Sequence, residues 1–322
     1  MEMEYTYGVA RIRALEGNLF SDDTIAALLQ CSDYNECLNF LRDKGWGNGD
    51  IEQPLEEMLQ NEKDKTKQLI RELAGDDNEI EILSIGDEFH NLKAAIKQVC
   101  TSGEAKNMFY TGCRLEPEFL KECIKQGQYS SLPPDMSEAA KEATEMLLQT
   151  GSGQLCDIII DRATLKAVRQ AGKKSKNGLI QKYADTVVTV ADIKIAVRCA
   201  ATNKDSEFVK KCVVPCEGVS ITDLTASVDG GIDSVCGYLE SAGYSEAVSA
   251  LKKSMSVFEC WCDNKIIQDI KPEKYNAFSI GPIVAYAIAR DIEIKTIKII
   301  LSGKQNGFDN EFLKERVRVM YA

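Results

Sequence analysis

The segment HNLKAAIKQVC (residues 90–100) decides the fold, because weaker copies of it occur twice more, as DIKIAVRCA (192–200) and TIKIILSGK (296–304). The pattern opens at Asn91, and its second and third copies follow after 101 and a further 104 residues. We call it the NLK marker. Solenoid repeats have periods of about 20 to 50 residues. The longer period therefore predicts duplication of a whole domain of roughly 100 residues.

The first copy has the periodicity and composition of an amphipathic helix. Leu92, Ile96 and Val99 follow an i, i+4, i+7 spacing with alanines between them, as one apolar helix face requires. The third copy lies in IEIKTIKII (292–300), which alternates and is rich in isoleucine and by itself favours a strand. If the copies are duplicates, the third is helical too, and Gly303 is its expected C-terminal stop.

A second repeated pattern, the helix-start marker, places capping or acidic residues before an apolar helical pattern. Its copies are FSDDTIAALLQ (20–30), LEPEFLKECIK (115–125) and VSITDLTASV (219–228), 95 and 104 residues apart. Ser and Asp can cap the first-turn amides, acidic side chains complement the helix dipole, and Pro117 suits a first turn. The marker predicts a helix start in every repeat.

The remaining sequence also has helical character. Further helices are expected in PLEEMLQNEKDKTKQLIREL (54–73), SEAAKEATEMLLQT (137–150) and, as the last one, NEFLKERVRVMYA (310–322). We therefore predict an all-α protein of three similar helical lobes. Their expected bounds are 1–113, 114–214 and 215–322.

Composition excludes several classes of function. The 322 residues carry a formal net charge of −11 with an isoelectric point near 4.9, so the surface should repel nucleic acid and anionic lipid. The N-terminus is acidic and lacks the apolar region of a secretory signal, which predicts a cytoplasmic protein. The most apolar stretch, SIGPIVAYAIA (279–289), is too short to span a bilayer. The 12 scattered cysteines are expected to be reduced.

His90, the single histidine of the chain, is a candidate general base because histidine titrates near neutrality. The alternative is an architectural residue at the top of a helix, close to Asp87 and Glu88. Neither of the other NLK copies has a histidine at this place. The comparison favours the architectural role.

Other patterns for chemistry are incomplete. The pairs Cys212/Cys216 and Cys260/Cys262 have C-x3-C and C-x-C spacings, which differ from the usual zinc knuckle. LSGKQNG (301–307) and GSGQLC (151–156) match neither the Walker nor the dinucleotide pattern. We expect no catalytic residue, cofactor or metal, and a protein that acts by binding others. A small thiol or metal enzyme and a generic helical scaffold remain alternatives.

Three segments together resemble the family of C subunits of prokaryotic V/A-type ATPases, which is similar to the d subunit of eukaryotic vacuolar pumps. They are the first 45 residues, the Phe-His-Asn-Leu-Lys phrase, and the Gly-Pro opening of the last helices from residue 281. The middle third matches less closely. The positions that carry the resemblance are Tyr5, Tyr7, Ala10, Arg11, Arg13, Phe89, Asn91, Lys93, Gly281 and Pro282.

The resemblance implies a funnel of three helical lobes with a pseudo-threefold arrangement. It implies a non-catalytic central-stalk adaptor that sits on the membrane rotor ring and holds the central shaft in its socket. Such an adaptor would lie on the cytoplasmic side, bound to the membrane only through the complex. It would couple ATP hydrolysis or synthesis to H⁺ or Na⁺ transport. The matching positions would be structural or partner-facing.

Overall fold

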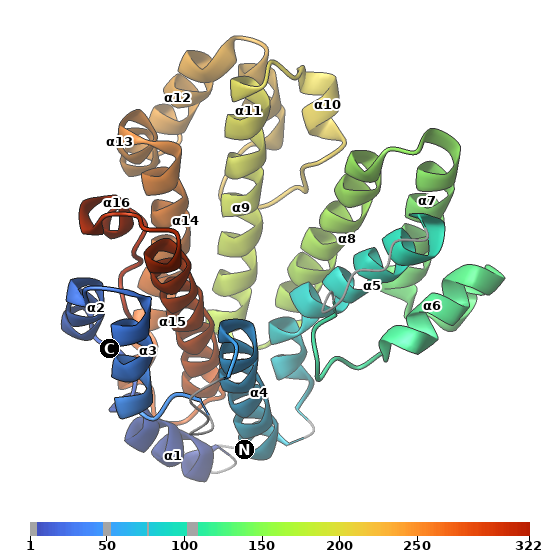
Figure 1. The fold of residues 1–322 in the computed structure, drawn as a ribbon. Helices are drawn as coiled ribbons and strands as arrows, with labels where there is room; N and C mark the ends of the chain where they lie inside the picture. The colour runs from blue at the N-terminus through green and yellow to red at the C-terminus, as the bar shows by residue number, and fades with distance from the viewer. Residues whose placement is uncertain (1–4, 48–52, 76, 102–108) are drawn as a thin grey trace. The chain divides into compact units, whose positions relative to one another are not determined.

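The computed structural model describes residues 5–47, 53–75, 77–101 and 109–322, and every regular element in these ranges is a helix (Figure 1). The predicted all-α class is confirmed. The helices form two compact units, of which unit 1 comprises Met1–Ile80 and Tyr244–Ala322, and unit 2 comprises Glu81–Gly243. The predicted lobe bounds at 113 and 214 stay a prediction. Within the described ranges, no helix has both the length and the apolar character to cross a bilayer.

Unit 1 joins the two ends of the chain. The long helix α15 packs against helices from both ends, and it runs beside α4 in Figure 1. The helices of this unit are α1 (Thr6–Glu16), α2 (Asp22–Gln30), α3 (Tyr34–Asp43), α4 (Leu55–Ala74), α13 (Ser245–Lys253), α14 (Met255–Ile270), η3 (Lys271–Tyr275), α15 (Gly281–Gln305) and α16 (Asn310–Lys314). The short helix η1 (Asn78–Leu83) spans the boundary to unit 2.

Unit 2 is continuous in sequence. Helix α5 packs against α6, α7 and α8, while α9 packs against α8, α10, α11 and α12. Its helices are α5 (Ile85–Thr101), α6 (Pro117–Gln126), η2 (Tyr129–Ser131), α7 (Pro134–Thr150), α8 (Gly153–Lys174), α9 (Gly178–Ala201), α10 (Ser206–Lys210), α11 (Ile221–Val228) and α12 (Gly231–Ser241).

All three copies of the helix-start marker begin a helix, as predicted. Ser21 accepts a hydrogen bond from the Thr24 amide at the start of α2, and Ser220 caps α11 in the same way. Helix α6 begins with Pro117 in its first turn. A capping serine satisfies an amide that a helix N-terminus leaves without a partner, and a first-turn proline has no amide hydrogen that needs one.

All three copies of the NLK marker are helical, including the strand-like third one, which lies in α15. In α15, 17 of the 25 residues are buried, because helices surround it. A helix that is apolar on nearly every side is stable only when it is enclosed. Burial by neighbouring helices therefore overrides the local preference of the β-branched isoleucines for a strand.

The expected stop at Gly303 is wrong. Helix α15 continues to Gln305, and Gly307 has the left-handed φ of +71°. Gly303 serves packing instead, because a Cβ built there would overlap Leu313 Cδ2 of α16. The glycine lets two helices approach closely.

The expected last helix is also shorter than predicted, since α16 ends at Lys314. Beyond it the backbone bonds to side chains of the same unit: the Val319 amide donates to Asn264 Oδ1 at 2.9 Å, and the Met320 amide to Asp22 Oδ1 at 2.8 Å. The alternating RVRVMY sequence suits an extended segment better than a helix.

The two units have cores built in the same way. In unit 1, Ile25 and Leu28 of α2 share a core with Ile297 and Leu301 of α15. In unit 2, Leu120 of α6 and its neighbours share a core with the NLK-marker residues Leu92 and Ile96 of α5. The core of unit 2 thus combines the NLK marker of the first repeat with the helix-start marker of the second. The core of unit 1 combines the NLK marker of the third repeat with the helix-start marker of the first.

Candidate functional site

His90 lies beside an aromatic ring, with its centroid 4.6 Å from that of Tyr110. Leu92 and Ile96 of the same helix are fully buried, as predicted. Lys93 and Lys97 form ion pairs with Asp161 at 2.7 Å and Asp157 at 2.6 Å. These pairs bind α5 to α8. The NLK segment of α5 is therefore a packing element of unit 2.

Eight of the twelve cysteines are buried and have the properties of core residues. Burial raises the pKa of Cys37 to about 12 and that of Cys212 to about 11. The Cys212 thiol donates to the Phe208 carbonyl at 3.4 Å, and the Cys260 thiol to the Glu315 carbonyl at 3.2 Å. At neutral pH such groups are thiols, whereas nucleophiles and metal ligands are thiolates. The described ranges contain no cluster of three or more His, Cys, Asp or Glu side chains suited to a metal.

Asn91 and its counterparts Asp192 and Thr296 are all fully buried polar residues. Asn91 donates to the Tyr110 carbonyl at 2.9 Å and accepts from the Tyr110 amide at 2.8 Å. Asp192 accepts from the Val214 amide at 3.1 Å. Tyr110 and Val214 each precede a helix-start marker by the same number of residues. The family-motif asparagine is thus structural, because it fixes the chain ahead of the next repeat.

Asp192→Asn is expected to stabilise the protein at high pH. Burial raises the pKa of Asp192 from 3.8 to about 7, so between these values the folded chain binds a proton that the unfolded chain has released. The free energy of unfolding of the wild type must then fall as pH rises through this range. The variant lacks this loss and should be more stable by about 2 kcal/mol at pH 8.

Urea unfolding at pH 4.5 and pH 8 measures this effect. The difference between variant and wild type should be larger at pH 8. The reciprocal change, Asn91→Asp, should introduce the same pH dependence into the first repeat. Equal stability differences between variant and wild type at both pH values would contradict a raised pKa of Asp192.

The α1 residues that carry the family resemblance hold unit 1 together. Tyr5 donates to Asp77, and Arg11 lies 3.8 Å from Glu72. Arg13 pairs with Glu16 at 2.6 Å and donates to the carbonyls of Glu273 and Asn276, both at 2.5 Å. Helix α1 therefore fixes α4 and the segment that leads into α15.

That segment, residues 271–281, we call the aromatic loop. The Asn276 side chain donates to Glu273 Oε2 at 2.9 Å and Ser279 Oγ at 2.8 Å, and the Gly281 amide donates to Ser279 Oγ at 3.1 Å. A Cβ at Gly281 would overlap Glu273 Oε2. Gly281 thus starts α15 where a side chain would displace the Glu273 carboxylate, and the buried Pro282 follows in the first turn of the helix.

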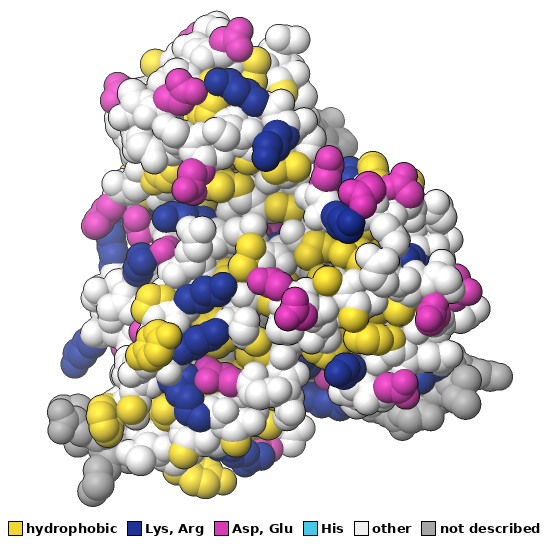
Figure 2. All heavy atoms as spheres, turned by 90° about the vertical axis from the view of Figure 1, so that its left-hand side faces the viewer, with side chains coloured by type: hydrophobic (Ala, Val, Ile, Leu, Met, Phe, Trp, Pro, Cys, Tyr) yellow, Lys and Arg dark blue, Asp and Glu magenta, His cyan; other side chains and the backbone are white. Residues whose placement is uncertain are grey.

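The aromatic loop presents two large side chains to solvent. Tyr275 is 91% exposed and Phe278 67%, and Tyr7 of α1 is 71% exposed. Exposed aromatic side chains on a rigid backbone are typical of protein-binding surfaces. Elsewhere, acidic, basic and apolar side chains alternate over the face drawn in Figure 2. The aromatic loop is our candidate partner-binding surface.

The structure groups the sequence-predicted positions by unit. In unit 1, Arg13 bonds to the aromatic loop, which leads into α15. Tyr5 and Arg11 instead contact Asp77 and Glu72, respectively, the latter on α4. The positions of unit 2 lie on α5. Of these positions, Phe89, Asn91, Gly281 and Pro282 are buried, and Tyr7 is 71% exposed. Sequence reasoning missed Tyr275 and Phe278. Two aromatics in the polar stretch EKYNAFS between helices were the available signal.

A comparison with family models decides the classification, because the model described as ATP synthase (C/AC39) subunit matches residues 8–316. The chain belongs to this family. The C/AC39 match runs from residue 8 to residue 316 and so includes parts of both compact units.

Three relatives are similar over 84–99% of their own length. The C subunit of the V-type sodium ATPase of Enterococcus hirae is 23% identical over 326 residues, which cover 99% of each chain. The C subunit of the A-type ATP synthase of Methanosphaera stadtmanae is 26% identical over 94% of this chain and 84% of its own. Its counterpart in Methanothermobacter thermautotrophicus is 25% identical over 97% of this chain and 87% of its own. The chain is thus similar to subunits of rotary ATPase complexes.

Proposed function

We propose that this protein is the non-catalytic central-stalk adaptor of a V/A-type rotary ATPase. It sits on the membrane rotor ring at the cytoplasmic side and holds the central shaft in its socket. In this position it transmits torque between the ATP-handling head and the ion-carrying ring. The names of its relatives, a V-type sodium ATPase subunit and A-type ATP synthase subunits, support this role.

The helix pairing supports a three-lobed funnel with pseudo-threefold symmetry. Helices α5 and α9 pack against helices of the following repeat, and α15 of the third repeat packs against α3 and α4 of the first. Pairing that runs from each repeat to the next and returns to the first is what a closed arrangement of three lobes requires. Such a closed set of enclosed helices suits a rigid coupler that carries load.

The experiment that tests this role is co-purification. A tagged copy of the protein, expressed in its native host, should retain the head and stalk subunits of the ATPase in detergent-solubilised membranes. Recovery of the protein alone, under conditions that preserve the assembled ATPase, would contradict the proposal and favour an unrelated scaffold.

His90→Ala should leave assembly and ATP-driven ion pumping nearly unchanged. The ring loses its contact with Tyr110, which is expected to cost no more than about 1 kcal/mol of unfolding free energy. Pumping in reconstituted vesicles and thermal unfolding measure the two effects. Loss of coupled activity in a fully assembled complex would instead assign His90 a role in function.

A further inference from the structure

The chain between α10 and α11, residues 211–220, forms no regular element and lies along α9. We call it the junction segment. Side chains of α9 fasten its backbone: Asp192 accepts from the Val214 amide at 3.1 Å, and Asp185 accepts from the Glu217 amide at 2.8 Å. Both of these acceptors are carboxyl groups, which change their hydrogen-bonding capacity when they bind a proton.

The junction segment packs tightly on α9. A Cβ built on Gly218 would overlap Thr189 of the helix. Val214 and Val219 of the segment are buried, and Asp192 beneath it has no exposed surface. The Asp192 carboxyl group therefore meets water only when the segment moves away from the helix.

Asn91 and Asp192 occupy equivalent positions but fasten the chain differently. Asn91 donates to the Tyr110 carbonyl and accepts from the Tyr110 amide. Asp192 accepts from Val214 through Oδ1, whereas its Oδ2 is buried and makes no hydrogen bond of normal geometry within the described ranges. A protonated carboxyl group carries one hydroxyl donor. Protonation thus allows Asp192 to reproduce the pair of bonds that Asn91 makes, with the Val214 carbonyl as the acceptor.

The surroundings of Asp192 oppose its ionisation. Burial raises its pKa to about 7, although the Val214 amide, the nearby Cys216 thiol and Arg169 of α8 favour the charged form. The titratable residues of the other helices that pack against α9, namely α10, α11 and α12, lie at the surface or are half-buried. They are Glu207, Lys210, Asp223, Asp233, Cys236, Tyr238 and Glu240.

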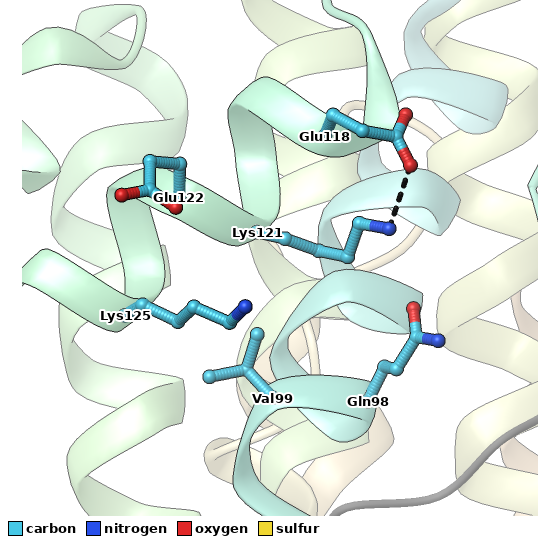
Figure 3. Close-up of a pocket in the computed structure, with 6 residues that line it drawn as sticks. All are labelled: Gln98, Val99, Glu118, Lys121, Glu122 and Lys125. Atoms are coloured by element: carbon cyan, nitrogen blue, oxygen red, sulfur yellow. Dashed lines mark hydrogen bonds and ion pairs between the residues drawn. The ribbon is translucent and has the colours of Figure 1, made fainter.

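A surface carboxylate of the same unit has the opposite behaviour. At the pocket drawn in Figure 3, Glu118 of α6 accepts a hydrogen bond from Lys121 at 2.7 Å, which lowers the pKa of Glu118. Such a carboxylate stays ionised at every pH above about 5. Burial under the junction segment is therefore what brings the titration of Asp192 close to neutral pH.

We propose that Asp192 fastens the junction segment in a proton-dependent way. When protonated, it bonds to both the amide and the carbonyl of Val214 and holds the segment on α9. When ionised, it keeps only the amide bond, and the segment opens more often. The connection between α10 and α11 is thus tighter in acid than at neutral pH. This device depends on contacts inside unit 2 alone and does not rest on the proposed role in a rotary ATPase.

The pH range of the effect follows from the closed and open states of the segment. In the open state water reaches Asp192, and its pKa returns toward the ordinary value of 3.8. Between that value and about 7, opening releases a proton, so opening becomes more frequent as pH rises. Above about pH 7 the carboxylate is charged in both states, and the frequency of opening levels off.

Hydrogen exchange of the Val214 amide, measured by NMR on the full-length protein labelled with nitrogen-15, reports the opening. Its protection factor, which corrects for the intrinsic pH dependence of exchange, should fall about tenfold from pH 5.5 to pH 7 and only about twofold from pH 7 to pH 8. Asp192→Asn should abolish both changes. Asp185→Asn alters the other carboxyl group that fastens the segment, and as the matched control it should retain them.

Low concentrations of urea distinguish local opening from unfolding of the whole unit. Opening of the segment exposes little surface, so the protection of Val214 should stay constant, whereas that of buried Ile193 in α9 should fall as urea is added. Equal urea dependence of the two amides would overturn the proposal. Protection of Val214 that is independent of pH in the wild type, or equally dependent on pH in Asp192→Asn, would overturn it as well.

Discussion

Arg290→Met is expected to lower the free energy of unfolding by about 3–5 kcal/mol, because it leaves the buried Glu293 carboxylate without its cation and leaves buried Glu62 with only the half-exposed Lys65. Arg290 lies 2.8 Å from Glu62 Oε2, pairs with Glu293, and stacks over Trp46 at 4.9 Å. Glu293 in turn accepts from the Phe20 amide at 2.6 Å. This network connects α15 to α4 and to the start of α2, which are distant in sequence.

The pH dependence distinguishes a lost ion pair from lost packing. Burial raises the pKa of Glu293 even with Arg290 present, and removal of the arginine should raise it further. The variant should therefore regain part of its stability as pH falls, when the folded state binds the proton.

Urea unfolding at pH 5 and pH 8 is the measurement for this network. Lys298→Met, at an exposed position of the same helix, is the control and should change stability by no more than about 0.5 kcal/mol. Adding Glu293→Gln to Arg290→Met should restore part of the loss. Equal effects of the two Met variants would show that the network does not stabilise the fold.

The second large effect concerns association. The double variant Tyr275→Ala/Phe278→Ala should retain the stability of the wild type to within about 0.5 kcal/mol, because both side chains are mostly solvent-exposed. It should nevertheless bind its ATPase partners at least tenfold more weakly, since exposed aromatics that become buried in an interface each contribute about 2 kcal/mol or more.

Quantitative pull-down of partner subunits at graded concentrations measures this loss. Leu148→Ala removes a similarly exposed apolar side chain (66%) from α7 and should bind as the wild type does. Normal association of the double variant would remove the aromatic loop from the interface.

The helical class and the starts of α2, α6 and α11 were predictable because local chemistry determines them. Capping serines, an N-terminal proline and an i, i+4, i+7 apolar face act within one or two turns. The helical state of residues 296–302 was predictable only through the other copies of the NLK marker. Its isoleucines alone favour a strand, and enclosure by surrounding helices supplies the missing stabilisation.

The features that were not predicted depend on contacts between segments that are distant in sequence. Gly303 was assigned as a helix stop, although Leu313 requires it for close packing. The Glu62–Arg290 pair spans most of the chain, and no local pattern indicates it. The sequences DSEFVK (205–210) and DNEFLK (309–314) are similar, but only the structure shows that α10 and α16 each pack against an NLK-marker helix and a helix-start-marker helix.

The proposed role requires this protein to join the central shaft to the membrane rotor ring. A sedimentation experiment with membranes that contain the ring but lack this protein, to which purified shaft subunits are added, measures that connection. We expect the shaft to sediment with the membranes only when this protein is also added, in a ratio of one copy per ring. Binding of the shaft that is equally tight without the protein would contradict it.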